Sequence, residues 1–332
     1  MGTEKQTMTQ DAETAGTHRE GALQGGTWWI APTPFAADGS VDGDAMERAV
    51  RTAVGWGVDG VTVLGVMGEV TSLSDAERDV VLGAVSRGAG DVPFAVGCSS
   101  ASAPLVAERA VRAQEHGAVA AMVAAPPLVR DADTVVAFFD AVGRRSPLPV
   151  LLQDEPVATG VQLAVSTLVE ALERSGAVAI KLEDAPTPPK ITKLLARVPD
   201  LTVYGGLGGV SAFAELSRGA AGTMTGFAYP EVLRAVRLAL ADGDRARAAQ
   251  VFDAFLPLIA FEGQPGYGLA IRKEVLRRRG ALTSGAMRGP VPSAGLDAVT
   301  TAELDEVLSR VGLDPSPERF DVDAFLGAEV AA

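Results

Sequence analysis

Eight short apolar runs recur along this chain at intervals of about 20–35 residues, and stretches with a helical pattern separate them. We expect strands at 27–35, 60–69, 93–100, 118–127, 148–156, 177–184, 201–209 and 222–230. Strands that are apolar on both faces are typical of a parallel sheet that is covered on both sides. Eight strand–helix units therefore predict an α/β protein with a TIM (β/α)8 barrel.

The competing architecture is a doubly wound sheet. Against it, no G-x-G-x-x-G follows the first predicted strand, and the chain has no phosphate-binding P-loop. After the eighth strand, helical patterns at about 231–262, 266–280 and 296–313 exceed what one further unit needs. We expect a helical extension there, with a frayed tail from about residue 314.

The chain is thus predicted to have three regions. They are a disordered polar tail over 1–26, the barrel over 27–262, and a C-terminal helical extension packed on the barrel over 263–332. No apolar run reaches the length of a membrane span, and the first residues lack the apolar segment of a signal peptide. The single cysteine, Cys98, excludes an internal disulfide framework. These features favour a cytoplasmic location.

Charge and histidine content narrow the classes of function. The net charge of −13 argues against nucleic acid or an anionic membrane as a partner. Of the two histidines, His18 lies in the tail and His116 ends a predicted helix. A Ser-His-Asp triad and a histidine-based metal site are therefore not expected. We expect no metal and no organic cofactor, so proton transfer would fall to carboxylates, Lys, Tyr or water.

A lysine interrupts the sixth apolar run, AVAIKLED, at Lys181. Only five of the 29 basic residues are lysines, so the chain mostly uses Arg where a surface cation is needed. Burial favours the neutral amine of a lysine, which can attack a carbonyl group and form a Schiff base. The structural alternative is a buried ion pair with Glu183, which shares a strand face with Lys181, or with Glu69.

Two strand ends carry further polar groups. Glycines in the segment from Gly65 to Glu69 let backbone N–H groups approach a carboxylate or phosphate, although a tight turn has the same composition. Alternation along a strand would place Gly65, Met67 and Glu69 on one face. By the same rule Gln153 and Glu155 share a face, whereas we interpret Asp154 as a solvated loop acid.

These motifs together resemble the N-acetylneuraminate lyase and dihydrodipicolinate synthase family of class I aldolases, over residues 27–313. That family has G-x-x-G-E-x-x-S-L-x-x-x-E-R after its second strand, which matches Gly65 to Arg78. Thr33-Pro34-Phe35 in the first strand and Ile180-Lys181 in the sixth also match. The resemblance implies that Lys181 is the Schiff-base lysine and that the protein is a homotetramer or homodimer.

The chain departs from the family at its proton relay. Val66 and Met67 stand where the family has two hydroxyl residues that bind the substrate carboxylate, so only backbone N–H groups remain as donors. Gln153 stands where the family has its acid/base Tyr, and Pro127-Leu128 where a second relay Tyr is expected. The arginine often found two residues after the Pro of that motif is Ala158. We therefore do not expect dihydrodipicolinate synthase activity.

Other residues are assigned to the site with less support. Glu155 is our candidate for the substitute acid/base, with a surface carboxylate as its alternative. Gly206 and Thr225 follow the seventh and eighth strands and are expected to line the pocket with Val66, Met67, Glu69 and Glu183. Tyr204 and Tyr267 are weaker candidates, because such residues are more often packing residues with a satisfied hydroxyl.

The predicted function is a Lys181-dependent lyase or aldolase that makes or breaks a C–C bond beside the carbonyl of a 2-oxo acid or a related carbonyl compound. Gln153 and Glu155 are its other predicted catalytic residues. One alternative is a 2-keto-3-deoxy sugar acid dehydratase that works through the same imine. The other is a non-catalytic barrel that binds a small metabolite.

Overall fold

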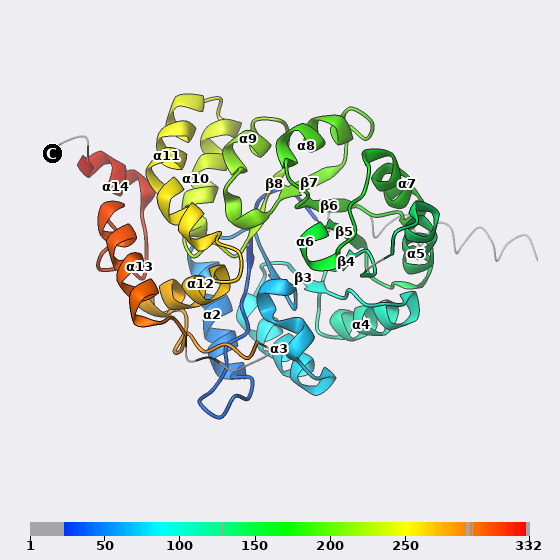
Figure 1. Cartoon of the computed structure of the whole chain (residues 1–332), viewed down its shortest axis with the longest axis horizontal. Helices are drawn as coiled ribbons and strands as arrows, with labels where there is room; N and C mark the ends of the chain where they lie inside the picture. The colour runs from blue at the N-terminus through cyan, green and yellow to red at the C-terminus, as the bar shows by residue number, and fades with distance from the viewer. Residues whose placement is uncertain (1–22, 128, 290–292, 294, 330–332) are drawn as a thin grey trace, which may run out of the picture.

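The strands form a closed parallel barrel in the order β1 to β8 (Figure 1). The structure is a computed structural model that describes residues 23–127, 129–289, 293 and 295–329. The strands are Thr27–Ile30, Gly60–Val63, Phe94–Gly97, Ala120–Ala124, Val150–Asp154, Ala179–Leu182, Thr202–Gly205 and Gly222–Thr225. The pairing of β1 with β8, from Thr27 opposite Thr223, closes the barrel. The predicted fold is confirmed, and each strand lies within its predicted run but is shorter.

The helices of the barrel surround the strands. They are α2 Gly43–Gly55, α3 Asp75–Ala89, α4 Ala103–Glu115, α5 Ala132–Arg145, α6 Pro156–Thr159, α7 Val165–Ser175, α8 Thr187–Leu195, α9 Ala212–Leu216 and α10 Pro230–Ala241. The start of α3 shows why such bounds are readable from sequence. Ser74 accepts the Glu77 N–H while the Glu77 carboxylate accepts the Ser74 N–H, which is a complete capping box.

In the described part of the chain, four helices follow α10. They are α11 Arg245–Glu262, α12 Gly268–Arg278, α13 Ala298–Arg310 and α14 Val322–Glu329. The single long helix predicted over 231–262 is wrong, because the chain turns between α10 and α11 at Gly243, whose φ is 79°. No helix of the described residues is long and apolar enough to cross a membrane.

Side chains fill the inside of the barrel. The interior cluster contains Trp28, Met122, Leu151, Ala179, Tyr204 and Met224. Leu23 is buried in the same cluster, and the Gln24 carbonyl accepts the Tyr204 hydroxyl at 2.6 Å. These two residues therefore do not belong to a disordered tail, whose other predicted residues up to 22 lie outside the described part of the chain.

The chain after residue 314 packs against the molecule. Phe320 contacts Phe255 of α11, with ring centroids 5.5 Å apart, and Val322 and Leu326 are buried. The predicted frayed tail is therefore wrong for this segment, since its apolar residues join a core that α10 and α11 provide. Figure 1 shows α13 and α14 beside α11, at the C-terminal end of the chain. The boundary placed at residue 262 stays a prediction.

Candidate active site

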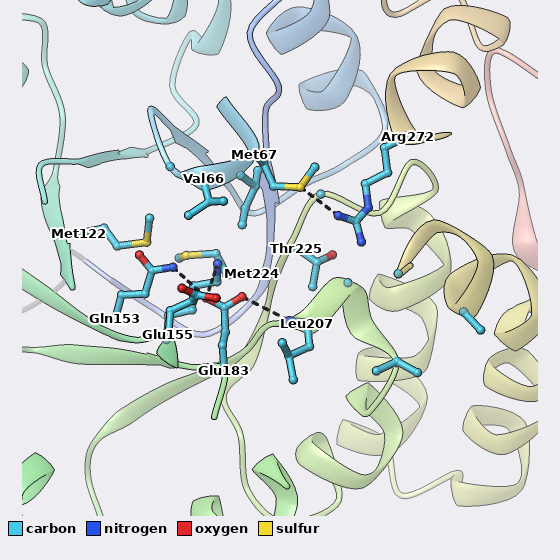
Figure 2. A pocket seen from close by; sticks show the side chains of 18 residues that line it. Val66, Met67, Met122, Gln153, Glu155, Glu183, Leu207, Met224, Thr225 and Arg272 are labelled. Atoms are coloured by element: carbon cyan, nitrogen blue, oxygen red, sulfur yellow. Dashed lines mark hydrogen bonds and ion pairs between the residues drawn. The ribbon is translucent and has the colours of Figure 1, made fainter. Parts of the chain in front are cut away.

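A cavity of about 440 Å3 opens at the carboxyl ends of the strands (Figure 2). Its polar lining includes Gln153, Glu155, Lys181, Glu183, Thr225 and Arg272, and much of the rest is apolar, including Met67, Met122 and Met224. A second cavity of about 450 Å3 over the ends of β3 and β4 shares Gly65, Val66, Met122, Gln153 and Glu155 with the first. The lining residues thus come from far apart in the sequence, as the barrel topology requires.

Strand alternation places Lys181 inside the barrel. Its neighbour Ala179, two residues earlier in β6, belongs to the interior cluster, whereas Ile180 and Leu182 belong to the outer core. Alternation then turns Lys181 inward, above Ala179. The side chain is 4% exposed, so the ammonium group meets the cavity rather than bulk water.

Glu183 connects the polar groups of the cavity floor. Its Oε2 lies 2.9 Å from Lys181 Nζ and accepts a hydrogen bond of 2.8 Å from Gln153 Nε2. Its Oε1 accepts the Leu207 N–H at 3.3 Å. Glu183 is one of the two ion-pair partners that the sequence predicts for Lys181. The carboxylate is thus held in one place, within proton-transfer distance of the lysine.

Gln153 and Glu155 both line the cavity, as expected for residues two apart. Gln153 lies in β5 above the interior residue Leu151, opposite Lys181 in the strand register. Glu155 is the N-cap residue of helix α6, and its carboxylate accepts the Ala158 N–H at 2.6 Å. Burial raises the pKa of Glu155, the Ala158 N–H opposes this, and the nearby charge of Glu183 adds to it. Glu155 can therefore hold a proton more readily than a surface carboxylate.

Asp154 lies on the other face of β5 and is not a solvated loop acid. It is 1% exposed and contacts Lys190 Nζ at 2.6 Å, as does Asp184 at 2.7 Å. Burial raises the pKa of Asp154 to about 6, against the effect of Lys190. The expectation was wrong because the outer face of this strand end is covered by α8, which carries Lys190.

The turn after β2 separates residues that were expected to share a face. Gly65, Val66 and Met67 line the cavity, but Glu69 does not. Strand β2 ends at Val63, and two short 3-10 turns follow, joined at Glu69 in the left-handed conformation with φ 51°. Strand alternation therefore no longer applies beyond Val63.

Glu69 is instead bound between this turn and the C-terminal region. It lies 2.6 Å from the fully buried Lys273 Nζ and accepts the N–H groups of Arg288 and Gly289, each at 2.8 Å. Glu69 thus has a structural role here and is not among the residues lining the cavity, and its contribution to substrate binding stays a prediction. It ties α12 and the following segment to the turn that lines the cavity.

The turn after β7 brings a backbone donor to the site. Gly206 packs against the Glu183 side chain, so no larger residue fits there, and Leu207 provides the N–H that Glu183 accepts. Thr225, the last residue of β8, lines the cavity, and its Oγ1 accepts the Phe227 N–H at 3.4 Å. Thr225 therefore lines the cavity as expected, whereas Gly206 lies at the end of its strand behind Glu183 and is not among the lining residues, a place that its neighbour Leu207 takes.

The three tyrosines of the chain lie elsewhere. Tyr204 points to the opposite end of the barrel, where its hydroxyl reaches Gln24 and its ring contacts Trp28. Tyr229 is buried against Phe320 and Arg279. Tyr267 is 55% exposed just before α12. Among the described residues lining the first cavity, Thr225 is the one hydroxyl side chain.

Sequence reasoning missed Arg272, which reaches the cavity from α12. Its side chain is 9% exposed, and Nε lies 3.5 Å from Oε2 of the fully buried Glu262. Figure 2 shows Arg272 and Met67 together on one side of the cavity and Gln153 and Glu183 on the other. Burial lowers the pKa of Arg272, while Glu262 and Glu183 oppose the shift. No local pattern reveals this residue, because its placement depends on how the C-terminal helices pack.

The described residues include no group of three or more His, Cys, Asp or Glu side chains placed to hold a metal ion. The chemistry available from the residues present is therefore that of an amine, two carboxylates, an amide and a guanidinium around one cavity. An amine beside a carboxylate, in a largely apolar cavity, is suited to attack a carbonyl carbon.

Comparisons with known proteins agree on one family. The model of the dihydrodipicolinate synthetase family matches residues 25–309. An L-2-keto-3-deoxyarabonate dehydratase of Azospirillum brasilense is 31% identical over 300 residues, covering 87% of this chain and 94% of that protein. A 4-hydroxy-tetrahydrodipicolinate synthase of Xanthomonas axonopodis pv. citri is 32% identical over 291 residues, covering 82% and 95%. The crystal structure of dihydrodipicolinate synthase from Rhodopseudomonas palustris superposes with a TM-score of 0.82 at 35% identity, covering 87% and 98%.

Proposed function

Because this chain belongs to the dihydrodipicolinate synthetase family, whose members are Schiff-base lyases and aldolases, we propose that it acts through Lys181 on the carbonyl group of a 2-oxo acid. The observation that carries the proposal is the placement of Lys181. Its ammonium group lies inside the barrel, lines the cavity, and is 2.9 Å from a carboxylate that can take its proton.

The first step would be formation of the imine. Glu183 takes a proton from the Lys181 ammonium group, and the neutral amine attacks the carbonyl carbon of the substrate. The carbonyl oxygen then leaves as water, with one proton from the amine and one returned by Glu183. A protonated imine remains on Lys181, and Glu183 is again a carboxylate. Gln153 supports this step because its amide fixes the carboxylate of Glu183.

The imine then serves as an electron sink. An enamine on Lys181 forms in one of two ways. Either the carbon next to the imine carbon loses a proton, or the bond from that carbon to the following carbon of the substrate is cleaved. Glu155 and Glu183 are the carboxylates in the cavity that can carry these protons. We assign the proton at Lys181 to Glu183 and propose Glu155 for the substrate side. Gly65, Val66, Met67 and Thr225 would shape the surface that the substrate meets, and Gly206 would support it from behind Glu183.

We further propose that the reaction is not that of dihydrodipicolinate synthase. Support comes from the lining of the cavity, which is poor in hydroxyl groups, and from the tyrosines of the chain, which lie elsewhere in the fold. A second candidate, dehydration of a 2-keto-3-deoxy sugar acid, is favoured by the similarity to the Azospirillum dehydratase. In that reaction the enamine expels the hydroxyl group from the carbon that follows its double bond. Glu155 protonates this hydroxyl group, which leaves as water. Hydrolysis of the resulting imine then releases the product and frees Lys181.

Product analysis tests the proposal. The purified protein is incubated with 2-oxo acids and 2-keto-3-deoxy sugar acids, and the products are identified by NMR. Cleavage yields two carbonyl products, whereas dehydration yields one product that has lost water. Lys181→Ala should abolish either reaction, and Lys193→Ala, which changes an exposed lysine of α8, should retain it. Full turnover by Lys181→Ala would refute the proposal.

We also propose that the chain assembles as a homodimer or homotetramer in the cytoplasm. Support comes from family membership, because solved structures of the family are usually oligomeric. Analytical ultracentrifugation of the full chain gives the mass of the assembly directly, and a monomer at micromolar concentration would overturn this assignment.

A further inference from the structure

The guanidinium group of Arg272 is buried, and its ion-pair partner among the described residues, Glu262, lies 3.5 Å away without forming a hydrogen bond. Its Nη1 contacts Met67 Sδ at 2.9 Å, and a thioether is a weak acceptor. Nε is buried without a hydrogen-bond partner, since Glu262 is 3.5 Å away. Within the described residues, Nη2 makes no hydrogen bond to the protein. Buried polar groups in folded proteins normally have partners, so this arrangement requires an explanation.

The turn after β7 leaves room for the fork of this arginine. Gly208 lies in that turn with φ 68°, and a Cβ atom there would stand 2.5 Å from Arg272 Nη2. Arg272 lines the cavity together with Thr225 and Gly263. The glycine therefore makes room for the guanidinium at the edge of the cavity, where a ligand can meet it.

The charges around the cavity leave Arg272 as the available cation. Lys181 and Glu183 already form a close pair, so their charges offset each other. Glu262 stands behind Arg272, and burial raises its pKa to about 7 despite the opposing charge of Arg272. Its carboxyl group is therefore partly protonated at neutral pH and offsets the guanidinium charge incompletely. Glu155 is a further carboxylate of the same cavity, so what favours an anionic ligand is the lack of a close oxygen acceptor at the Arg272 guanidinium rather than the net charge of the lining.

We propose that Arg272 binds a carboxylate of the substrate and so selects 2-oxo acids over neutral aldehydes and ketones. The inference rests on the proposed function and deepens it, because it assigns a binding residue to the same cavity. The planar guanidinium presents two N–H groups in the geometry that a carboxylate accepts. It would supply, from α12, an anchor that the apolar side chains of Val66 and Met67 cannot provide.

Two carboxylates fit this description. One is the carboxylate beside the carbonyl of any 2-oxo acid, and the other is a second carboxylate at the far end of a longer substrate. Pyruvate and 2-oxobutyrate carry only the first, whereas 2-oxoglutarate carries both. A comparison of these three ligands therefore separates the two sources.

The experiment is a calorimetric titration of all three ligands into Lys181→Met protein, which cannot form an imine. In that background Arg272→Gln should weaken binding by about 10- to 100-fold, as expected for the loss of a charge-assisted pair, and Arg272→Lys should recover part of it. Arg48→Gln is the matched control, because it removes the same charge from an exposed position on α2. A loss shared by all three ligands assigns the carboxylate beside the carbonyl. A loss confined to 2-oxoglutarate assigns the distal one.

Affinities that stay within twofold for all three ligands, in an Arg272→Gln protein that melts like its parent, would overturn the proposal. If the variant does not fold, or the Lys181→Met background binds too weakly, the unaltered protein gives the answer. Phenylglyoxal modification of Arg272, followed by peptide mapping, should slow at least severalfold when a 2-oxo acid is present. An unchanged rate would contradict the proposal. Neither measurement needs an imine. A negative result for carboxylate binding by Arg272 is therefore distinct from a negative result for imine formation by Lys181.

Discussion

At the scale of single residues, the lysine proposed as the nucleophile is also the lysine of a buried ion pair. The sequence left a buried pair and a catalytic amine as alternatives for Lys181, and the structure shows that the pair exists at the edge of a cavity. A buried pair adds little net stability once desolvation is counted. Its partner Glu183 is also held by Gln153 and Leu207, which is the arrangement expected for a carboxylate that must remain in place during proton transfer.

Replacement of the carboxylate tests its role. Glu183→Gln preserves the shape but cannot accept a proton, so kcat should fall by about 10²- to 10⁴-fold in a variant that still folds. Steady-state kinetics on the substrate found by product analysis would measure this. Glu170→Gln, on the exposed face of α7, is the control and should keep its kcat. A Glu183→Gln protein with unaltered kcat would remove Glu183 from the mechanism.

At the scale of elements, patterns were reliable where a strand was regular and failed where it ended. The positions of Lys181 and Gln153 follow from alternation within β6 and β5. The position of Glu69 does not follow from alternation, because the chain enters 3-10 turns after β2. The Glu69 side chain points toward Lys273 instead. Arg272 was beyond reach for a related reason. Arg272 lies on α12, its neighbours come from α11, the β7 turn and the β2 turn, and only tertiary packing brings these together.

The assignment of Glu69 to structure can be measured. Glu69→Ala leaves the fully buried Lys273 without its carboxylate, so the free energy of unfolding should fall by about 3–5 kcal/mol. Urea denaturation would show the loss, and Glu303→Ala on an exposed position of α13 should leave stability unchanged. If Glu69→Ala instead unfolded like the unaltered protein but had lost its activity, the expected role of Glu69 in substrate binding would regain support.

At the scale of the whole molecule, the stability should decrease as the solution becomes more basic. Glu215 of α9 is fully buried, shares a hydrogen bond with the Thr187 hydroxyl, and has its other oxygen unpaired among the described residues. Burial raises its pKa from 4.5 to about 7, against the Thr187 hydrogen bond and with a contribution from Glu183. Between these values the folded protein holds a proton that the unfolded chain releases. Stability from this group is therefore complete below pH 4.5 and is lost as the pH rises toward 7.

Glu215→Gln should remove that dependence. A shift of this size corresponds to a loss on the order of 3 kcal/mol between pH 4.5 and 8, and the variant should lack this contribution. The free energy of unfolding, measured in urea at several pH values, would show a flatter profile for Glu215→Gln than for the unaltered protein. Part of the slope should remain, because burial raises the pKa of Glu262 in the same direction. An unchanged profile would mean that Glu215 is ionised in the folded state.

The barrel could be predicted from the sequence, whereas the packing of the C-terminal segment could not. Eight apolar runs suffice for the barrel, because parallel strands can only be covered by the helices between them. The packing of Phe320 and its neighbours after residue 314 was missed, since their partners lie on α10 and α11 and no local pattern records that contact.

The most direct test of the central claim is trapping of the imine. The protein is incubated with pyruvate and a panel of 2-oxo acids and aldehydes, reduced with borohydride, and digested for peptide mapping by mass spectrometry. The account predicts a mass increment on Lys181 and none on Lys273, which is equally buried but paired with Glu69 outside the cavity. A folded protein that gives no adduct on Lys181 with any of these compounds would contradict it. The pair of Lys181 and Glu183 would then be structural, in a barrel that only binds its ligand.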